Sequence, residues 1–86
     1  MSNSTAKIEK RDDVDPKDGE REYGDAEFAD PVNKKYPIDT EKHVRAAWSY
    51  INQKDNAAKY DLDEVETIKN RIKRAAKRFD IEIEEN

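Results

Sequence analysis

Hydrophobic residues recur with a helical period in the second half of the chain. Four of them stand at positions i, i+3, i+4 and i+7, on one face of a helix: Val44, Ala47, Trp48 and Ile51. Either Asp39 or Thr40 can cap the first turn, and Glu41 complements the positive end of the helix dipole. The pattern therefore predicts an amphipathic helix over residues 40–54.

A second helical pattern begins after a short connection. Asp61 and Glu64 have the spacing of a capping box, in which each side chain accepts a backbone N–H of the other residue. The following apolar residues stay in one sector of the helix: Leu62, Val65, Ile68, Ile72, Ala75, Ala76 and Phe79. The pattern predicts a helix over residues 62–79.

The short connection at residues 57–60 predicts that the two helices run antiparallel with their apolar faces together. We expect Trp48 and Phe79, the largest apolar side chains, to fill this seam. Two helices alone bury little apolar surface, so another segment must cover the open side. Residues 25–39 are expected to do so as an irregular strap, because Pro31 and Pro37 favour extended backbone before them.

The apolar residues among the first 24 positions show neither a helical nor a strand period. The large ones, Ile8, Val14 and Tyr23, are spread among many charged residues. This composition predicts a disordered acidic arm over residues 1–24, followed by a small helical domain over residues 25–83. The expected fold class is mainly α: an antiparallel two-helix hairpin closed by the strap.

Composition narrows the function classes. A chain of 86 residues holds one domain, and its net charge of -4 is too small to steer it to nucleic acid or to an anionic membrane. The absence of cysteine excludes disulfides, thiolate nucleophiles and sulfur-ligated metals. No apolar run has the length of a signal-peptide core or a membrane span. We expect a cytoplasmic monomer that does not bind membranes.

Candidate chemistry is sparse. His43 stands in the first turn of a helix, where the dipole disfavours its charged form, and a structural role is favoured over catalysis. The acidic run from Asp12 to Glu20 invites comparison with a calcium loop, but Lys17 and Asp18 occupy positions that need a ligand and a glycine. No glycine follows a strand in a phosphate-binding pattern. We therefore expect no enzyme activity, catalytic residue, metal or cofactor.

The basic residues of the second helix are the most suggestive feature. They lie on both flanks of the apolar face and wrap its solvent side: Lys69, Arg71, Lys73, Arg74, Lys77 and Arg78. A solvated helix face is favoured, and the alternative is contact with nucleic acid through Lys73, Arg74, Lys77 and Arg78. The aromatic residues Tyr36, Tyr50, Tyr60 and Trp48 are expected in the core rather than as base-stacking platforms.

The middle of the chain resembles a known family. The matching segments are Tyr23-Gly24-Asp25, Phe28-Ala29-Asp30-Pro31, the run from Asn33 to Asp39, His43 to Ile51, and Asn56 to Tyr60. With Ile68, Arg71, Ile72 and Ala75, they resemble a small bacterial and phage-associated family labelled as a domain of unknown function. The resemblance covers about residues 23–79. It implies that strap and hairpin form one unit, that the arm is a variable addition, and it supplies no catalytic residue.

Two function classes stay open from the sequence. The first is a small protein-interaction module, because an ordered helical unit without a reactive constellation is best suited to binding a protein partner. The second is a nucleic-acid-binding accessory protein that uses the basic second helix. An enzyme ranks last.

Overall fold

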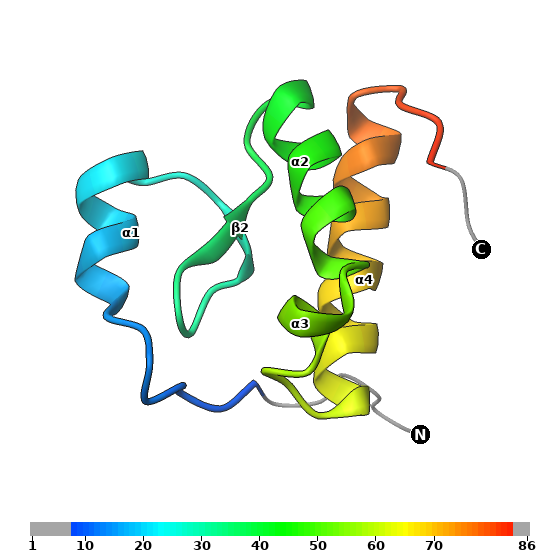
Figure 1. Ribbon diagram of the computed structural model, residues 1–86. Helices are drawn as coiled ribbons and strands as arrows, with labels where there is room; N and C mark the ends of the chain where they lie inside the picture. Colours follow the sequence, from blue (N-terminus) through cyan, green and yellow to red (C-terminus); the bar gives the residue numbers. More distant parts are fainter. Residues whose placement is uncertain (1–7, 84–86) are drawn as a thin grey trace, which may run out of the picture.

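The computed structural model describes residues 8–83 (Figure 1). Within this range the chain forms four α-helices and one two-stranded sheet. In chain order these are α1 Pro16–Tyr23, β1 Phe28–Asp30, β2 Lys35–Pro37, α2 Glu41–Ile51, α3 Lys54–Ala57 and α4 Leu62–Arg78. The mainly α class is confirmed. The description as two helices and a strap is incomplete, since α1, α3 and the sheet were not predicted.

Helices α2 and α4 lie side by side and run in opposite directions (Figure 1). Their starts are those that the sequence indicated. The Thr40 hydroxyl accepts the His43 N–H at 3.0 Å, and Asp61 and Glu64 form a reciprocal capping box. The core between the helices is aliphatic, and its fully enclosed residues are Val44, Ala47, Ile51, Ile68, Ile72 and Ala75.

The first predicted helix ends earlier than expected. Asn52 terminates α2, where its backbone N–H at 3.3 Å and its side-chain amide at 2.8 Å both donate to the Trp48 carbonyl. The next N–H, that of Gln53, bonds to the Tyr50 carbonyl at 3.1 Å, so the α-helical pattern stops. The connection then contains the single turn α3, where the Asn56 amide donates to the Tyr50 carbonyl at 2.9 Å. The predicted range of 40–54 therefore spans the end of one helix and the start of another.

Two predicted core residues are exposed. Leu62 is 87% exposed because it is the first residue of α4, and Phe79 is 37% exposed because it lies just beyond the helix. Asp80 follows with a left-handed φ of 59°, and the Ile81 N–H then bonds back to the Ala76 carbonyl at 2.8 Å. This turn buries Ile81 in the core, so Phe79 does not fill the seam.

The expected irregular strap is a short β-hairpin. Strands β1 and β2 pair antiparallel, with Phe28 opposite Pro37 and Asp30 opposite Lys35. Pro37 ends its strand at the outer pairing position, where its missing N–H matters least. The Asp30 carboxylate accepts the N–H groups of Val32 and Asn33, both at 3.1 Å, which shapes the turn. The prediction of irregular structure is wrong here.

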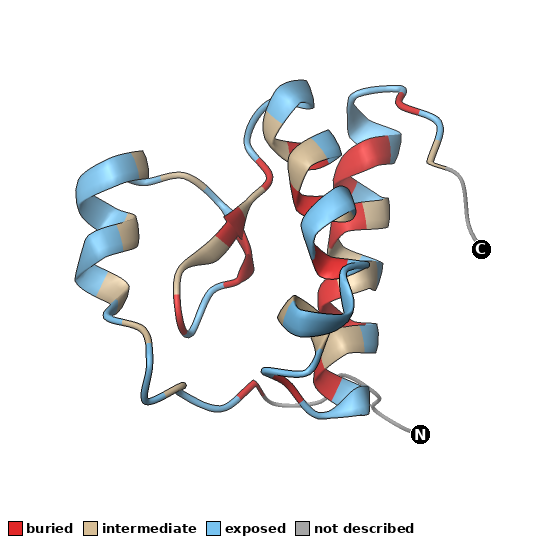
Figure 2. Ribbon diagram, viewed as in Figure 1, coloured by how far each residue is buried: buried red, intermediate tan, exposed pale blue. Residues whose placement is uncertain are grey.

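Residues 8–24 are part of the fold, so the predicted disordered arm is wrong over this range. Asp15 caps α1 by accepting the Lys17 N–H at 3.0 Å, and Pro16 occupies the first helical position, where no N–H is needed. Ile8 is only 4% exposed and belongs to the core. Helix α1 itself has a mostly exposed surface (Figure 2). The rest of the predicted arm, residues 1–7, lies outside the described residues.

Candidate functional site

A buried polar cluster joins the start of the described chain to the β-hairpin. Asp30 and Asn33 are both fully buried. The Asn33 amide donates to the Glu9 carbonyl at 3.0 Å and to the Asp30 carboxylate at 2.9 Å, while its oxygen accepts the Arg11 N–H at 2.6 Å. Every polar group of the Asn33 side chain thus has a partner, which fixes residues 9–11 against the hairpin.

Tyr60 completes the cluster from the connection between α3 and α4. Its hydroxyl donates to the Asp30 carboxylate at 2.7 Å and accepts from the Arg11 guanidinium at 3.2 Å. Burial, followed by the bond to the Asp30 carboxylate, raises the pKa of Tyr60 well above its usual value. The Arg11 guanidinium lies 5.0 Å from the Tyr60 ring centre and also pairs with Asp13. The Tyr60 hydroxyl therefore links the buried Asp30 carboxylate to the Arg11 cation, which offsets the free-energy cost of burying the negative charge.

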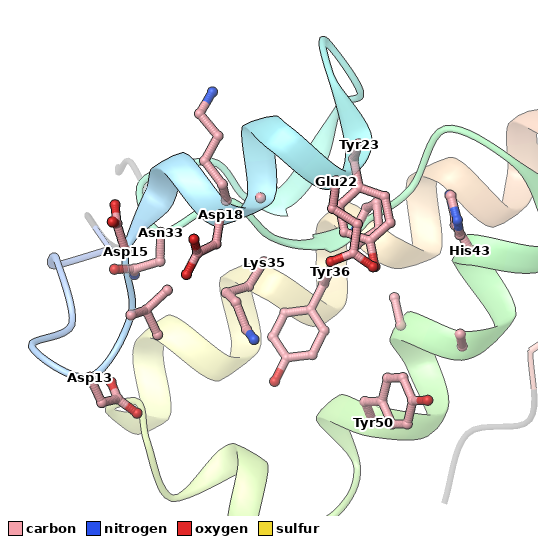
Figure 3. Close-up of a pocket in the computed structure, with 16 residues that line it drawn as sticks. Asp13, Asp15, Asp18, Glu22, Tyr23, Asn33, Lys35, Tyr36, His43 and Tyr50 are labelled. Carbon is pink, nitrogen blue, oxygen red and sulfur yellow. The ribbon is translucent and has the colours of Figure 1, made fainter.

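This cluster holds the segment that precedes α1, and α1 in turn forms one wall of a cleft. The cleft has a volume of about 340 Å³, at the small end of the range for ligand pockets. Figure 3 shows Glu22, Tyr23 and His43 at one end of it, Asp13 and Asp15 at the other, and Lys35 and Tyr36 between them. Helix α2 closes the opposite side.

The cleft combines carboxylates with tyrosines. Asp15, Asp18 and Glu22 are spaced i, i+3 and i+7, so they share one face of α1. Tyr50 of α2 lines the cleft and is 53% exposed. Tyrosine offers a large apolar ring and a polar tip, which suits a surface that is wet when free and covered when bound. Chemically, the arrangement favours a cationic or mixed ligand over an anionic one.

His43 lies in this cleft with a defined partner. Its Nδ1 is 2.5 Å from an Asp39 carboxylate oxygen, and its ring meets the Tyr23 ring edge-on at 5.3 Å. A histidine oriented by a carboxylate is half of a nucleophilic triad. The cleft-lining residues include no serine, threonine or cysteine that the imidazole could activate. The contact between the His43 and Tyr23 rings ties the start of α2 to the end of α1.

The six basic residues of α4 divide into two groups. The ammonium groups of Lys69 and Lys73 lie 5.7 and 5.8 Å from the Trp48 ring centre, so they cover a partly buried residue that packs against the core. Lys77 is exposed beyond them. Arg71, Arg74 and Arg78 instead line a groove of about 390 Å³ beside the β-hairpin. The predicted set of Lys73, Arg74, Lys77 and Arg78 is therefore not one surface.

Sequence reasoning missed part of both surfaces. Lys34, from the hairpin turn, lines the arginine groove, and no local pattern connects it to α4. The cleft residues of α1 were missed because residues 1–24 lack an apolar period. A signal was present: Asp15-Pro16 is a helix-start pair, and Gly24 suits the helix end, where its φ is 65°.

Other site types find no support in the part of the chain that the structure describes. Over residues 8–83, no group of three or more histidine and carboxylate side chains is arranged to hold a metal ion. The aromatic predictions are correct for Tyr36 and Tyr60, which are buried, and wrong for Tyr50. None of the described helices has the length and apolarity that crossing a membrane requires.

These features define a small, mainly α-helical domain with a β-hairpin, an acidic tyrosine-lined cleft and an arginine groove. The chain belongs to the family of unknown function DUF6582, whose model matches residues 4–86. The match includes most of the segment expected to be a variable addition, so that expectation is corrected. Neither a curated protein nor a solved structure matches the chain significantly.

Proposed function

We propose that the protein is a small non-catalytic protein-interaction module, and that its binding surface is the cleft between α1, β2 and α2. The observation that supports this proposal is the cleft lining: four carboxylates and three tyrosines surround a cavity that is open to solvent. Tyrosine-rich, partly exposed surfaces are typical of protein interfaces. A shaped cleft without a nucleophile suits binding better than catalysis.

The charges of the cleft indicate the chemistry of the partner. Asp13, Asp15, Asp18 and Glu22 line it together with two lysines, Lys34 and Lys35. Lys34 already lies 3.8 Å from the Glu20 carboxylate. The end near Glu22 and Tyr23 is separated from Lys35 in Figure 3. We expect this end to accept a lysine or arginine side chain, whose charge the carboxylate neutralises and whose stem packs on the tyrosine rings.

A peptide-display selection against the folded chain tests the proposal. Enrichment of peptides that carry lysine or arginine is the expected result. Tyr50→Ala removes an exposed ring, and we expect it to weaken a selected peptide about 30-fold, the effect of an interface residue worth about 2 kcal/mol. Glu22→Gln should weaken only peptides with a basic residue.

The matched control is Glu66→Gln, an exposed carboxylate on α4 that does not line the cleft. It changes the net charge by the same amount and should leave peptide affinity unchanged. No enrichment of any peptide, or equal loss in Glu22→Gln and Glu66→Gln, would contradict the proposal.

The alternative function is nucleic-acid binding through the second helix. One observation supports this alternative: all three arginines of α4 line the same groove. The groove shares Lys34 with the cleft, but its arginines do not line the cleft, so variants at the arginines test this surface independently.

A further inference from the structure

We infer that the groove between the β-hairpin and α4 is a binding site for the phosphate backbone of a nucleic acid, formed by Lys34, Arg71, Arg74 and Arg78. These four cations line one groove together with a single carboxylate, Glu27. The chain as a whole carries a net charge of -4. The local excess of positive charge therefore runs against the overall balance, and an anionic ligand is what the groove attracts.

The three arginines form a row along α4. At about 100° per residue, positions 71, 74 and 78 fall within a sector of about 60° on the helix surface. With a rise of about 1.5 Å per residue the row is about 10 Å long, and one strand of DNA places about three phosphates in that length. The row thus fits a run of phosphates better than one isolated phosphate.

The groove holds its cations by contacts that leave donors for a ligand. Arg71 gives one N–H to the Ala29 carbonyl at 3.1 Å, which fixes the side chain beside β1 and leaves the rest of its five N–H donors for other acceptors. Arg78 pairs with Glu27 at 2.9 Å, and both side chains are more than half exposed, so the pair exchanges readily. Arg74 forms no ion pair with any residue between 8 and 83.

The exposure of Phe28 decides whether the groove can stack on bases. Phe28 lines it but is only 4% exposed, so its ring is not available to stack on a base. The groove therefore offers charged N–H donors to phosphate oxygens and no exposed ring on which a base could stack. Such contacts position a nucleic-acid backbone without selecting its sequence. Within residues 8–83, the groove and the proposed protein-binding cleft have Lys34 as their one common lining residue.

Fluorescence anisotropy of labelled single-stranded and double-stranded oligonucleotides tests the inference in the full chain. Four phosphate contacts to a single strand predict a log–log salt slope of about -2.8, or an affinity loss of about 50-fold between 50 and 200 mM salt. Arg74→Gln combined with Arg78→Gln should halve this slope, so that the same change in salt weakens binding only about 7-fold.

The matched control combines Lys73→Gln with Lys77→Gln, which removes two charges from the opposite flank of the same helix. It should keep the slope of the unmodified chain. Equal effects of the two pairs would overturn the inference, because the charge would then act diffusely. Absence of salt-dependent binding would overturn it as well. Circular dichroism and Trp48 emission check that each variant is folded.

Two competitors distinguish other anions. Inorganic phosphate should displace the oligonucleotide no better than chloride at equal ionic strength, and specific displacement would assign the groove to a single phosphate instead. Polyglutamate that binds more tightly than the oligonucleotide would assign it to an acidic protein. Neither arginine lines the cleft, so failure here leaves the proposed peptide binding unaffected.

Discussion

The buried cluster around Asp30 offers the sharpest test of how the fold is held together. Tyr60→Phe removes one oxygen and leaves the ring that packs against Tyr36 and Arg11. The lost hydroxyl donates to the buried Asp30 carboxylate at 2.7 Å and accepts from Arg11 at 3.2 Å. The carboxylate would keep the Asn33 amide and two backbone N–H groups, but no longer its link to the cation.

The magnitude follows from these contacts. A hydrogen bond to a charged group contributes about 1.5–3 kcal/mol, so we expect Tyr60→Phe to lower the free energy of unfolding by about 2 kcal/mol. For a domain of this size, that corresponds to a fall in the melting temperature of about 10 °C. Urea unfolding followed by Trp48 emission measures the free energy, and calorimetry measures the temperature.

Tyr50→Phe is the matched control, because it removes the same atom from a ring that is half exposed. Its effect should stay within about 0.5 kcal/mol. If the two variants were equally stable, the cluster around Asp30 would not be a stabilising feature. A double-mutant cycle with Arg11→Met should show a coupling energy of about 0.5 kcal/mol or more. Additive effects would mean that Arg11 does not stabilise the cluster through Tyr60.

Three further predictions concern other contacts. Gly19→Ala should destabilise the fold by about 1–3 kcal/mol despite alanine's higher helix propensity, because the added Cβ would lie 2.5 Å from the Lys34 carbonyl oxygen. Urea unfolding, with Lys17→Ala as the control on the same helix, shows whether the change destabilises or stabilises the fold. Glu64→Ala should cost about 2 kcal/mol and speed amide exchange at Glu9, since Glu64 accepts the Asp61 and Glu9 N–H groups at 2.8 Å each; unchanged exchange would contradict this role. The free energy of unfolding should fall above about pH 10, because an unfolded tyrosine loses its proton there while native Tyr60, whose pKa is raised, keeps it. Urea midpoints measured at rising pH should therefore fall less steeply in Tyr60→Phe than in the unmodified chain.

The starts of the main helices could be predicted because their signals are local. Thr40 and the Asp61–Glu64 box act within one turn, and the helical period of Val44, Ala47 and Ile51 is a property of neighbouring residues. The ends were harder. Asn52 ends α2, and its side-chain amide shares the Trp48 carbonyl with its own backbone N–H, a local bond that the apolar period does not indicate.

The candidate surfaces depended on contacts between distant residues. Lys34 and Arg74 share a groove only because the hairpin packs beside α4, and their separation in the chain gives no signal of it. Glu22 and Tyr50 line one cleft only because α1 stands across from α2. A sequence pattern can show that a helix has a basic flank, but not which flank a second segment will approach.

The sequence by itself determined the mainly α class, the positions of α2 and α4 and most of the aliphatic core, because caps and apolar periods act over one or two turns. The tertiary structure decided the rest. Residues 8–24 look disordered by composition, yet Ile8 is buried and Asn33 binds the backbone of residues 9 and 11. These partners are more than 20 residues apart in the chain, and only folding brings the buried polar groups together.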